Sequence, residues 1–419
     1  MDIPNLTINP DRLWADFEQL AHIGATPEGG VHRLALSNAD LQARTWFAGQ
    51  VDAAGLTLCD DAAGNLSAIL PSLNPNAKTL LIGSHLDSVP NGGCYDGSVG
   101  VLAALECLRV VQASGVALPV HLEAINFTDQ EGCWQGLFGS KALTGKLSPL
   151  SLNGDPDQHD DNNQKAAFRA ALQRAGIHPS DVQQARRQPA SVAGYLELHI
   201  EQGARLDRHG AHIGIVTGIV GRSTYEITFL GEASHSGTTA PQDRRDALQA
   251  AAHFIQIAHT RFSRNAGAFN CGNLRVLPGA FNIIPAQAVL TVEVRHPDEA
   301  QLRGMEKRLL TLARKCAERY HLTCSTEQMV HMPAAPMSEQ FQTWIASACQ
   351  HLGISDSLPL ISYAGHDAQM LSSFTPSGMI FIPSQHGISH NPKEYTEWAD
   401  VVLGANVLLH TVLRVALSV

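Results

Sequence analysis

The chain has 419 residues and a mass of 45.0 kDa, a length that suggests two or three domains. Hydrophobic residues make up 44% of it, which is enough apolar surface to fold most of the chain and excludes extensive disorder. The formal net charge of −10 argues against nucleic acid or an anionic membrane as the main partner, because both require a cationic surface. A small anionic substrate remains compatible, since it responds to the local field.

Cysteine use and the first residues indicate a reducing compartment. None of the eight cysteines forms a C-x-x-C pair, which disfavours a disulfide framework or a thiolate zinc site. The first residues, MDIPNLTINPDRLWADF, lack the basic and apolar regions of a signal peptide. No uninterrupted apolar run approaches the roughly 18 residues of a membrane span. We therefore expect a cytoplasmic protein without a membrane partner. The 20 histidines are a first hint of metal chemistry.

The first half of the chain predicts an α/β fold. Lys78–Gly83 and Val120–Phe127 are apolar runs typical of buried strands, and Ser98–Gln112 between them has helical spacing. A strand, a helix and a strand in this order imply a largely parallel sheet with helices on both faces. A further strand is predicted at Gly194–Ile200. Ligands in such sheets gather beyond the carboxyl ends of the strands.

The pattern of predicted strands and helices changes between residues 213 and 330. This block is long enough to be an inserted α+β domain, so we expect residues 1–212 and 331–419 to form one discontinuous domain around it. A polar stretch, Asn153–Pro189, is expected to be a surface excursion that contains a helix at Lys165–Ala175. The other predicted elements are strands at Ile213–Val220, Arg222–Leu230, Ala288–Val294, Leu322–Val330 and Gly378–Ile382, and helices at Arg245–His259, Glu299–Tyr320 and Trp398–Ala416.

Four loop segments carry histidines and carboxylates just after predicted strands. They are GSHLDSVPNGGCYDG (from Gly83), FTDQEG (from Phe127), ELHIEQG (from Glu197) and PSQHGISHNPKE (from Pro383). Imidazole and carboxylate are ligands of zinc, manganese and similar ions, and a carboxylate is able to bridge two of them. A single such histidine is usually an ordinary surface or capping residue. Four segments at strand ends of one domain favour a metal site.

These segments resemble the M20 metallopeptidase family, and within it the branch of N-carbamoyl-L-amino acid hydrolases, allantoate amidohydrolases and β-ureidopropionases. The resemblance runs from about Phe17 to Leu413. Its motifs are GSHLDSVPNGGCYDG, LELHIEQG, HSGTTAPQDRRDA, FNIIPA, EVRHPD, AGHDAQ and GISHNPKEYT. It implies a zinc-exopeptidase-like fold whose inserted domain is a lid and dimerisation domain, and therefore a homodimer.

The resemblance implies two divalent metal ions per subunit, zinc or manganese, with cobalt or nickel as alternatives. Asp96 would bridge the two ions. His85 and His199 would complete one site, and Glu131 and His390 the other. Asp87 would hold the imidazole of His85 from behind. His199 favours the carbamoyl-hydrolase branch, because the peptidase branches usually carry a carboxylate there.

One position departs from the family. The family reads Glu-Glu-Gly after this strand, and its first Glu is the general base, whereas this chain has Gln130 followed by Glu131. An amide cannot accept and return a proton, and a general base is typically worth about 10²- to 10⁴-fold in rate. The substitution is either engineered or natural, with weak or absent activity. Asp129 is a poor substitute, because neighbouring side chains on an extended strand point oppositely.

Four further residues match substrate-binding positions of the family. His235 would stabilise the developing oxyanion, although taken alone it reads as a turn histidine. Asn282 would bind the substrate amide, and Gln202 the carbamoyl group. Arg295 would bind the substrate carboxylate through its bidentate fork, against an ordinary ion pair with Asp298.

Two other motifs leave questions open. The usual GTTPM of the family is Gly237-Thr238-Thr239-Ala240-Pro241 here, with the proline shifted by one, which leaves the loop shape open. Gly365-His366-Asp367 matches a family motif without an assigned role.

The resemblance therefore predicts a metal-dependent amidohydrolase acting on the linear C–N bond of an N-carbamoyl amino acid or a related ureido acid, a small substrate that bears a carboxylate. Two alternatives stay open. Gln130 is compatible with a catalytically silent binding or regulatory protein that retains its metals. An M20 aminoacylase or exopeptidase is the other alternative, and His199 argues against it.

Overall fold

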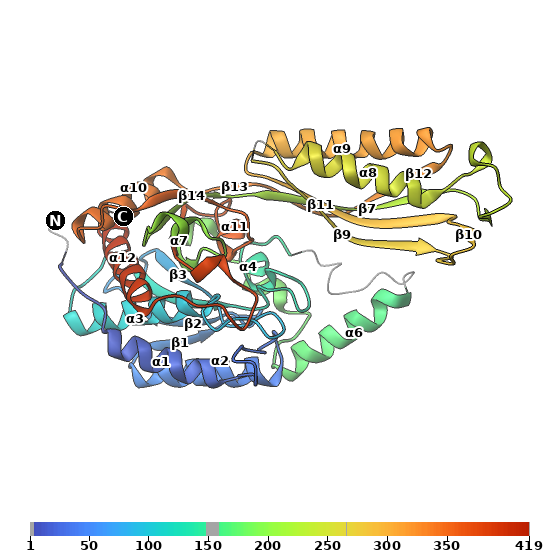
Figure 1. Cartoon of the computed structure of the whole chain (residues 1–419). Helices are drawn as coiled ribbons and strands as arrows, with labels where there is room; N and C mark the ends of the chain where they lie inside the picture. The colour runs from blue at the N-terminus through green and yellow to red at the C-terminus, as the bar shows by residue number, and fades with distance from the viewer. Residues whose placement is uncertain (1–3, 148–158, 265, 419) are drawn as a thin grey trace. The chain divides into compact units, whose positions relative to one another are not determined.

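The computed structural model describes residues 4–147, 159–264 and 266–418, and divides into two compact units. The main unit comprises Met1–Thr217 and Pro336–Val419, and the inserted unit comprises Gly218–Ala335. The boundaries predicted from the sequence lie five residues earlier at each junction. Figure 1 shows the chain leaving the main unit, forming the inserted unit and returning.

The main unit is built on a nine-stranded mixed sheet. Its strand order is β1-β2-β4-β3-β5-β15-β6-β13, with β14 paired to β6. The four central strands are parallel, β1 and β2 run antiparallel to their neighbours, and β6 runs antiparallel to β15. The strands are β1 (Thr57–Asp60), β2 (Leu66–Leu70), β3 (Thr79–His85), β4 (His121–Phe127), β5 (Val192–Ile200), β6 (Gly214–Ile219), β13 (Ala335–Pro336), β14 (Leu358–Ser362) and β15 (Ser377–Ile382).

Helices cover both faces of this sheet, as the sequence predicts. They are α1 (Pro10–His22), α2 (Asn38–Ala53), α3 (Ser98–Ser114), α4 (Phe138–Leu143), α6 (His159–Arg174), α7 (Arg205–His209), α10 (Glu339–His351), α11 (Asp367–Leu371) and α12 (Trp398–Ala416). Alternate strand residues such as Ile82 and Leu198 join the large core with α3 and α12. On the opposite face, the backbone N–H of Ala368 in α11 donates to Glu197 of β5. The polar segment predicted to hold a helix contains α6, but residues 148–158 lie outside the described part.

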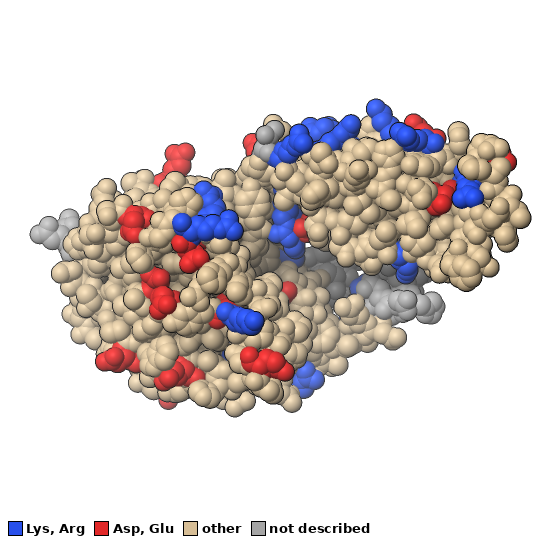
Figure 2. Space-filling model, in the orientation of Figure 1, with Lys and Arg blue, Asp and Glu red and all other residues tan. Residues whose placement is uncertain are grey.

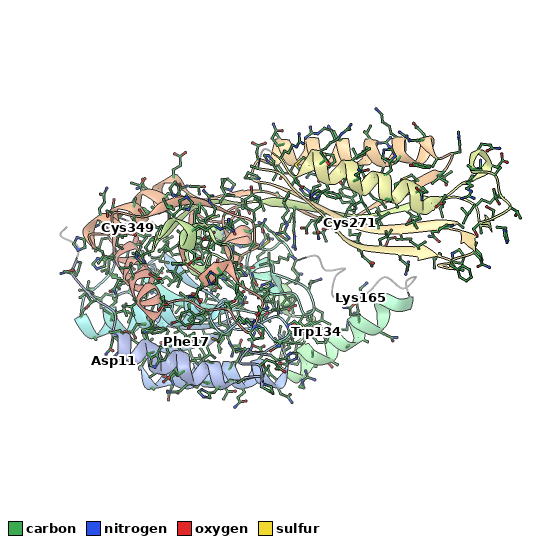
Figure 3. The ribbon with its side chains drawn as sticks, viewed as in Figure 1. Asp11, Phe17, Trp134, Lys165, Cys271 and Cys349 are labelled. Carbon is green, nitrogen blue, oxygen red and sulfur yellow. The ribbon has the colours of Figure 1, made fainter. Side chains whose placement is uncertain are left out.

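Aromatic packing fixes the N-terminal helices to the main unit. Phe17 of α1, labelled in Figure 3, lies 4.7 Å from the ring of Tyr95 between centroids. Trp134, also labelled, stacks on Phe168 of α6 at an interplanar angle of 14°. The two contacts bring the N-terminal and α6 segments against the loops that follow β3 and β4.

The inserted unit is an antiparallel sheet covered by two helices. The sheet order is β12-β7-β11-β9, with β7 (Gly221–Leu230), β9 (Ala268–Leu277), β11 (Gln287–His296) and β12 (Thr323–Met332). Helices α8 (Ala247–Phe262) and α9 (Glu299–Arg319) bury Phe254, Leu302 and Leu309 against it. A two-stranded pair, β8 (Ser234–His235) and β10 (Ile283–Ile284), lies outside this sheet. The unit is therefore the α+β insertion that the sequence predicts.

Among the described residues, α12 is the one helix long and apolar enough to cross a membrane by length and composition. Its apolar window is 72% buried inside the protein. It packs on α3, α10, β5 and β15, so its hydropathy is explained by its place in the core.

Gly83 in β3 permits the close approach of β4. A Cβ built on Gly83 would lie 1.9 Å from the carbonyl oxygen of Ile125, its partner in β4. We expect Gly83→Ala to lower the free energy of unfolding by about 3 kcal/mol, at the upper end of overpacking costs. Urea denaturation measures this, with Gly49→Ala as the matched control. Gly49 has open space within α2, so this change should stabilise by about 0.5–1 kcal/mol. A neutral Gly83→Ala would contradict the steric account.

Candidate metal centre

The carboxyl ends of the central parallel strands gather the five predicted metal ligands. His85 ends β3, and His199 is the penultimate residue of β5. Glu131 follows β4, and Asp96 lies in the loop that leads into α3. His390 lies in the loop between β15 and α12. Crossover connections between parallel strands place these loops at one edge of the sheet, which is how residues 305 positions apart come together.

Asp96 lies between two ligand groups, one at each carboxylate oxygen. Its Oδ1 lies 3.1 Å from Nε2 of His199 and 3.6 Å from Nε2 of His85. Its Oδ2 lies 3.4 Å from Nε2 of His390, which is also 3.4 Å from Oε1 of Glu131. The candidate ligand atoms of each group lie within 4.8 Å of one another. The arrangement has the form expected of a carboxylate that bridges two ions.

Backbone hydrogen bonds orient the two buried histidines so that Nε2 of each faces Asp96. Nδ1 of His199 donates to the carbonyl of Ile200 at 2.9 Å, and Nδ1 of His85 donates to the carbonyl of Asp87 at 2.9 Å. With the proton on Nδ1, each Nε2 carries a lone pair. Both Nε2 atoms are buried, and neither makes a hydrogen bond. In their neutral form, the two rings therefore present Nε2 lone pairs on either side of one carboxylate, an arrangement that fits a divalent cation once it displaces the protons.

The pKa shifts of the site are also consistent with a site for a divalent cation. Burial alone would raise the pKa of Asp96, but its contacts with His199 and His390 hold that pKa well below its usual range. Contacts with Asp96 and Glu131 raise the pKa of His390 to about 10. Burial lowers the pKa of His199, and the contact with Asp96 outweighs it and raises the pKa to about 9. Without a metal, protons on the imidazoles balance the carboxylates, and a divalent cation would take over that role.

Asp87 holds the loop after β4 rather than the ring of His85. Its two carboxylate oxygens accept the backbone N–H groups of Gln130 and Glu131 at 3.2 and 3.1 Å. The carboxylate lies 3.7 Å from Nδ1 of His85, and the backbone carbonyl of Asp87 is the hydrogen-bond partner instead. Asp87 lies beside His85 as expected, but its backbone carbonyl, and not its carboxylate, accepts the hydrogen bond from the ring. Asp87 thus positions a ligand and the general-base position together.

Gln130 is buried at the general-base position, with 8% of its surface exposed. Its side-chain Nε2 donates to the backbone carbonyl of Gly365 at 3.0 Å. The Gly365-His366-Asp367 segment therefore has one definite role here, which is to orient the amide of Gln130. An amide N–H suits this carbonyl, whereas an ionised carboxylate would repel it.

Asp129 does not substitute as a base. It adopts a left-handed conformation with φ of 52°, and its carboxylate accepts the backbone N–H groups of Trp134 and Gln135. Burial raises the pKa of Asp129 to about 6, although these bonds oppose the shift. The sequence argument assumed an extended strand end, but β4 stops at Phe127. Asp129 is still a poor substitute for the base, but the reason is that its carboxylate already accepts hydrogen bonds from the backbone of the loop 133–135.

Two buried residues near His199, Glu197 and His366, had no role assigned from the sequence. Glu197, His199 and His366 form a third group of candidate ligand atoms within 4.8 Å. The His366 ring lies 4.4 Å from that of His199 between centroids, its Nε2 pairs with Ser362 and its Nδ1 makes no hydrogen bond. Burial keeps the pKa of His366 well below its usual value, so the ring is neutral. His366 packs directly behind a ligand.

Gln202 lies among the ligands. It has a φ of 55°, and its Nε2 donates to Oδ2 of Asp96 at 2.8 Å and to Ser389 at 3.2 Å. The same nitrogen lies 3.2 Å from Nε2 of His390. The side chain predicted to contact a carbamoyl group therefore lies at the metal centre.

The other three residues predicted to bind substrate belong to the inserted unit. His235 and Ile283 are paired in β8 and β10, which brings Asn282 beside His235. Nδ1 of His235 accepts the backbone N–H groups of Gly237 and Thr238, both at 3.1 Å, so its exposed Nε2 carries the proton. The His235 ring therefore accepts hydrogen bonds within its turn through Nδ1, while its Nε2–H can still donate a hydrogen bond. Arg295 pairs through Nε with Glu293 at 2.6 Å.

The loop with the shifted proline is well defined. Pro241–Asp243 forms a 3₁₀ turn, and Arg244 donates to the carbonyls of Ser236 and Thr239. Asp246 then caps α8. The altered Ala240-Pro241 order is therefore accommodated in the turn that precedes α8.

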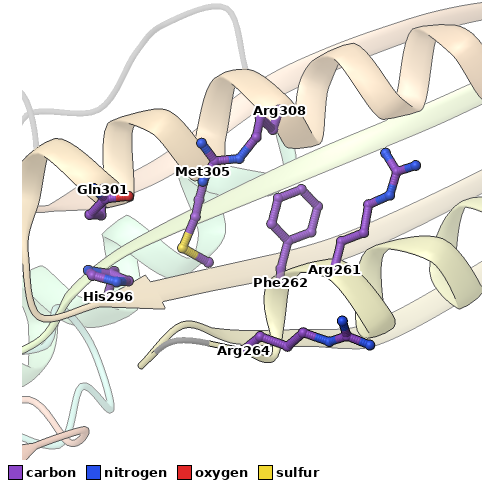
Figure 4. A pocket seen from close by; sticks show the side chains of 7 residues that line it. All are labelled: Arg261, Phe262, Arg264, His296, Gln301, Met305 and Arg308. Atoms are coloured by element: carbon purple, nitrogen blue, oxygen red, sulfur yellow. The ribbon is translucent and has the colours of Figure 1, made fainter.

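A separate cationic hollow of about 400 Å³ lies between α8 and α9 (Figure 4). Arg261, Arg264 and Arg308 line it over a floor of Phe262 and Met305. Figure 2 shows basic side chains along this edge of the inserted unit. Arg261 lies in the last turn of α8, where the helix dipole favours positive charge. The hollow contains none of the predicted site residues.

Known proteins resemble the chain over nearly its whole length. Residues 81–414 match the model of peptidase family M20/M25/M40. An N-carbamoyl-L-amino acid amidohydrolase of Geobacillus stearothermophilus is 36% identical, with 98% of this chain and 99% of that protein covered. An allantoate amidohydrolase of Bacillus subtilis is 30% identical over 95% of this chain and 96% of its own length. A crystal structure of a hydantoinase/carbamoylase family amidase from Burkholderia multivorans superposes with a TM-score of 0.86 at 32% identity, covering 99% of both chains. The chain belongs to the peptidase family M20/M25/M40, in the branch that contains these amidohydrolases.

Proposed function

We propose that this chain is a metal-dependent amidohydrolase that cleaves the linear C–N bond of an N-carbamoyl amino acid or a related ureido acid. The observation that carries the proposal is Asp96, whose two oxygens face separate imidazole groups. The names of the relatives, which include N-carbamoyl-L-amino acid amidohydrolases, support the reaction class. The proposed cofactors are two divalent ions, zinc or manganese, held by His85, Asp96, Glu131, His199 and His390.

Bound divalent ions would polarise the substrate carbonyl and lower the pKa of the hydrolytic water. The chain's own residues would orient the reactants. Gln202 would donate from its Nε2 to the carbamoyl oxygen, for which it must exchange one of its partners Asp96 and Ser389. His235 would donate from its Nε2–H to the developing oxyanion. Arg295 would hold the substrate carboxylate, for which it must exchange its partner Glu293. Gln130 would hold a substrate group by hydrogen bonds without transferring a proton, so turnover is proposed to be slow.

A second candidate function rests on Gln130 alone. A protein that keeps its metals and its substrate contacts but lacks the base would bind a ureido acid and release it unchanged. The two candidates share one binding site and differ in turnover.

A substrate panel tests the proposal. The metal-loaded protein is incubated with an N-carbamoyl amino acid, allantoate, an N-acetyl amino acid and a dipeptide. Binding is measured by calorimetry, and product formation is followed over hours. We expect binding of the carbamoyl or ureido compounds, with slow release of ammonia. Binding and cleavage of the dipeptide or the N-acetyl compound instead would support the exopeptidase or aminoacylase alternative. Binding without any turnover would support the silent protein.

Two further expectations from the resemblance remain proposals. They are a homodimer formed through the inserted unit, which would then serve as the lid, and a cytoplasmic location. Sedimentation of the protein at micromolar concentration tests the first, and a monomer would contradict it.

A further inference from the structure

Glu394 is a buried carboxylate beside the metal centre that belongs to neither ligand group. It lies in the same loop as His390 and has 4% of its surface exposed. Its Oε1 accepts the backbone N–H groups of Tyr95 and Asp96, each at 3.0 Å. One oxygen therefore holds the backbone of the bridging aspartate itself.

The second oxygen of Glu394 connects to the side chain of that aspartate. The hydroxyl of Ser389 lies 2.9 Å from Oε2 of Glu394 and 3.1 Å from Oδ2 of Asp96, and is able to donate to either. Glu394 thus contacts Asp96 twice, through its backbone and through Ser389. The loops that carry Asp96 and His390 are separated by almost 300 residues, and this carboxylate ties them together.

The opposing loop has a matching space for Glu394. A Cβ on Gly93 would lie 2.1 Å from both Cδ and Oε1 of Glu394. Only glycine at position 93 lets the carboxylate approach the two amides. The loop that carries Asp96 is therefore shaped around Glu394, as well as around the ligands.

We propose that Glu394 is a positioning residue that fixes the bridging Asp96 relative to His390 and thereby sets the affinity for divalent metal. The inference rests on the metal-binding part of the proposed function. Groups that orient a ligand typically change metal affinity by about 10- to 100-fold when removed. For metal affinity, the length of the Glu394 side chain, which lets one oxygen contact both amides, matters more than its negative charge.

Two variants of Glu394 separate the effect of side-chain length from the effect of charge. Glu394→Gln keeps the length and one oxygen for both amides, and loses the charge. Glu394→Asp keeps the charge and is shorter by one C–C bond, about 1.5 Å, so it cannot span to both amides. Cobalt chloride is titrated into the metal-free proteins, and affinity, stoichiometry and the visible absorption spectrum are recorded. Glu397→Gln, at an exposed position three residues away, is the control.

Positioning predicts that Glu394→Gln binds cobalt within a few-fold of the unchanged protein, with the same spectrum. It predicts that Glu394→Asp binds about 10- to 100-fold more weakly, with an altered spectrum. The reverse order, or equal affinity for all variants, would overturn the inference. Failure of the unchanged protein to bind cobalt would instead refute the metal centre of the proposed function. Thermal unfolding of the metal-free variants verifies that each is folded, and a merely structural role would lower these midpoints without changing the spectrum.

Discussion

Replacing Gln130 by Glu should raise kcat for an N-carbamoyl or ureido substrate by about 10²- to 10⁴-fold, the typical contribution of a positioned general base. The new carboxyl would face the carbonyl of Gly365, which now accepts from Gln130 at 3.0 Å. That carbonyl favours the protonated acid and so raises its pKa toward neutrality. A base of this kind accepts a proton and returns it readily. KM should change little, because the metals and the substrate contacts are unaltered.

The measurement is the initial rate of ammonia release over a range of pH with the metal-loaded variant. We expect a rate that rises through the raised pKa of the new carboxyl, since only the ionised form acts as the base. Gln188→Glu, which adds a carboxylate at an exposed position of the main unit, is the control and should leave the rate unchanged. A gain seen with both variants would point to a general charge effect and contradict a specific role for position 130.

Asp96→Asn should abolish tight metal binding. The amide has one acceptor oxygen where the carboxylate presents two, each facing a separate ligand group. It also removes the negative charge that would attract the cations, a loss that outweighs the easier deprotonation of His199 and His390. We expect affinity for zinc or manganese to fall by more than about 100-fold, beyond the loss caused by removing an orienting group.

Metal stoichiometry and thermal unfolding measure this effect. The unchanged protein should gain about 2.7 kcal/mol of stability at a metal concentration of 100 Kd, and Asp96→Asn should gain almost nothing at the same concentration. Asp52→Asn, at an exposed position of α2, is the matched control and should keep the full gain. If Asp96→Asn still binds two ions, Asp96 is not the bridge.

The sequence predicts the elements that carry the metal ligands well. Helix α12 has the predicted bounds, Trp398–Ala416, and β4 differs from its predicted strand by one residue. These segments have clear apolar periodicity, and their ends are marked by glycine or polar residues. Helices α1 and α2 were not predicted. Strand β9 was not predicted either, because most of its residues are exposed and it shows no apolar alternation.

Contacts made by the backbone could not be predicted from the sequence. The role of Asp87 depends on which of its oxygen atoms meets His85, and the position of Asp129 depends on a left-handed backbone after β4. Glu394 stood in one of the four predicted segments, but its partners are amides almost 300 residues away. No spacing rule predicts such a pairing. The family resemblance supplied the candidate ligands, whereas the residues that hold them act through loops distant in sequence.

We propose that this chain is a metal amidohydrolase whose turnover is limited by residue 130. The most direct test compares ammonia release from one N-carbamoyl amino acid by the metal-loaded protein and by its Gln130→Glu variant, at matched metal content. The account predicts slow release by the unchanged chain and a rate at least about 10²-fold higher for the variant. Equal rates, or no hydrolysis by a variant that binds both metals and substrate, would contradict it.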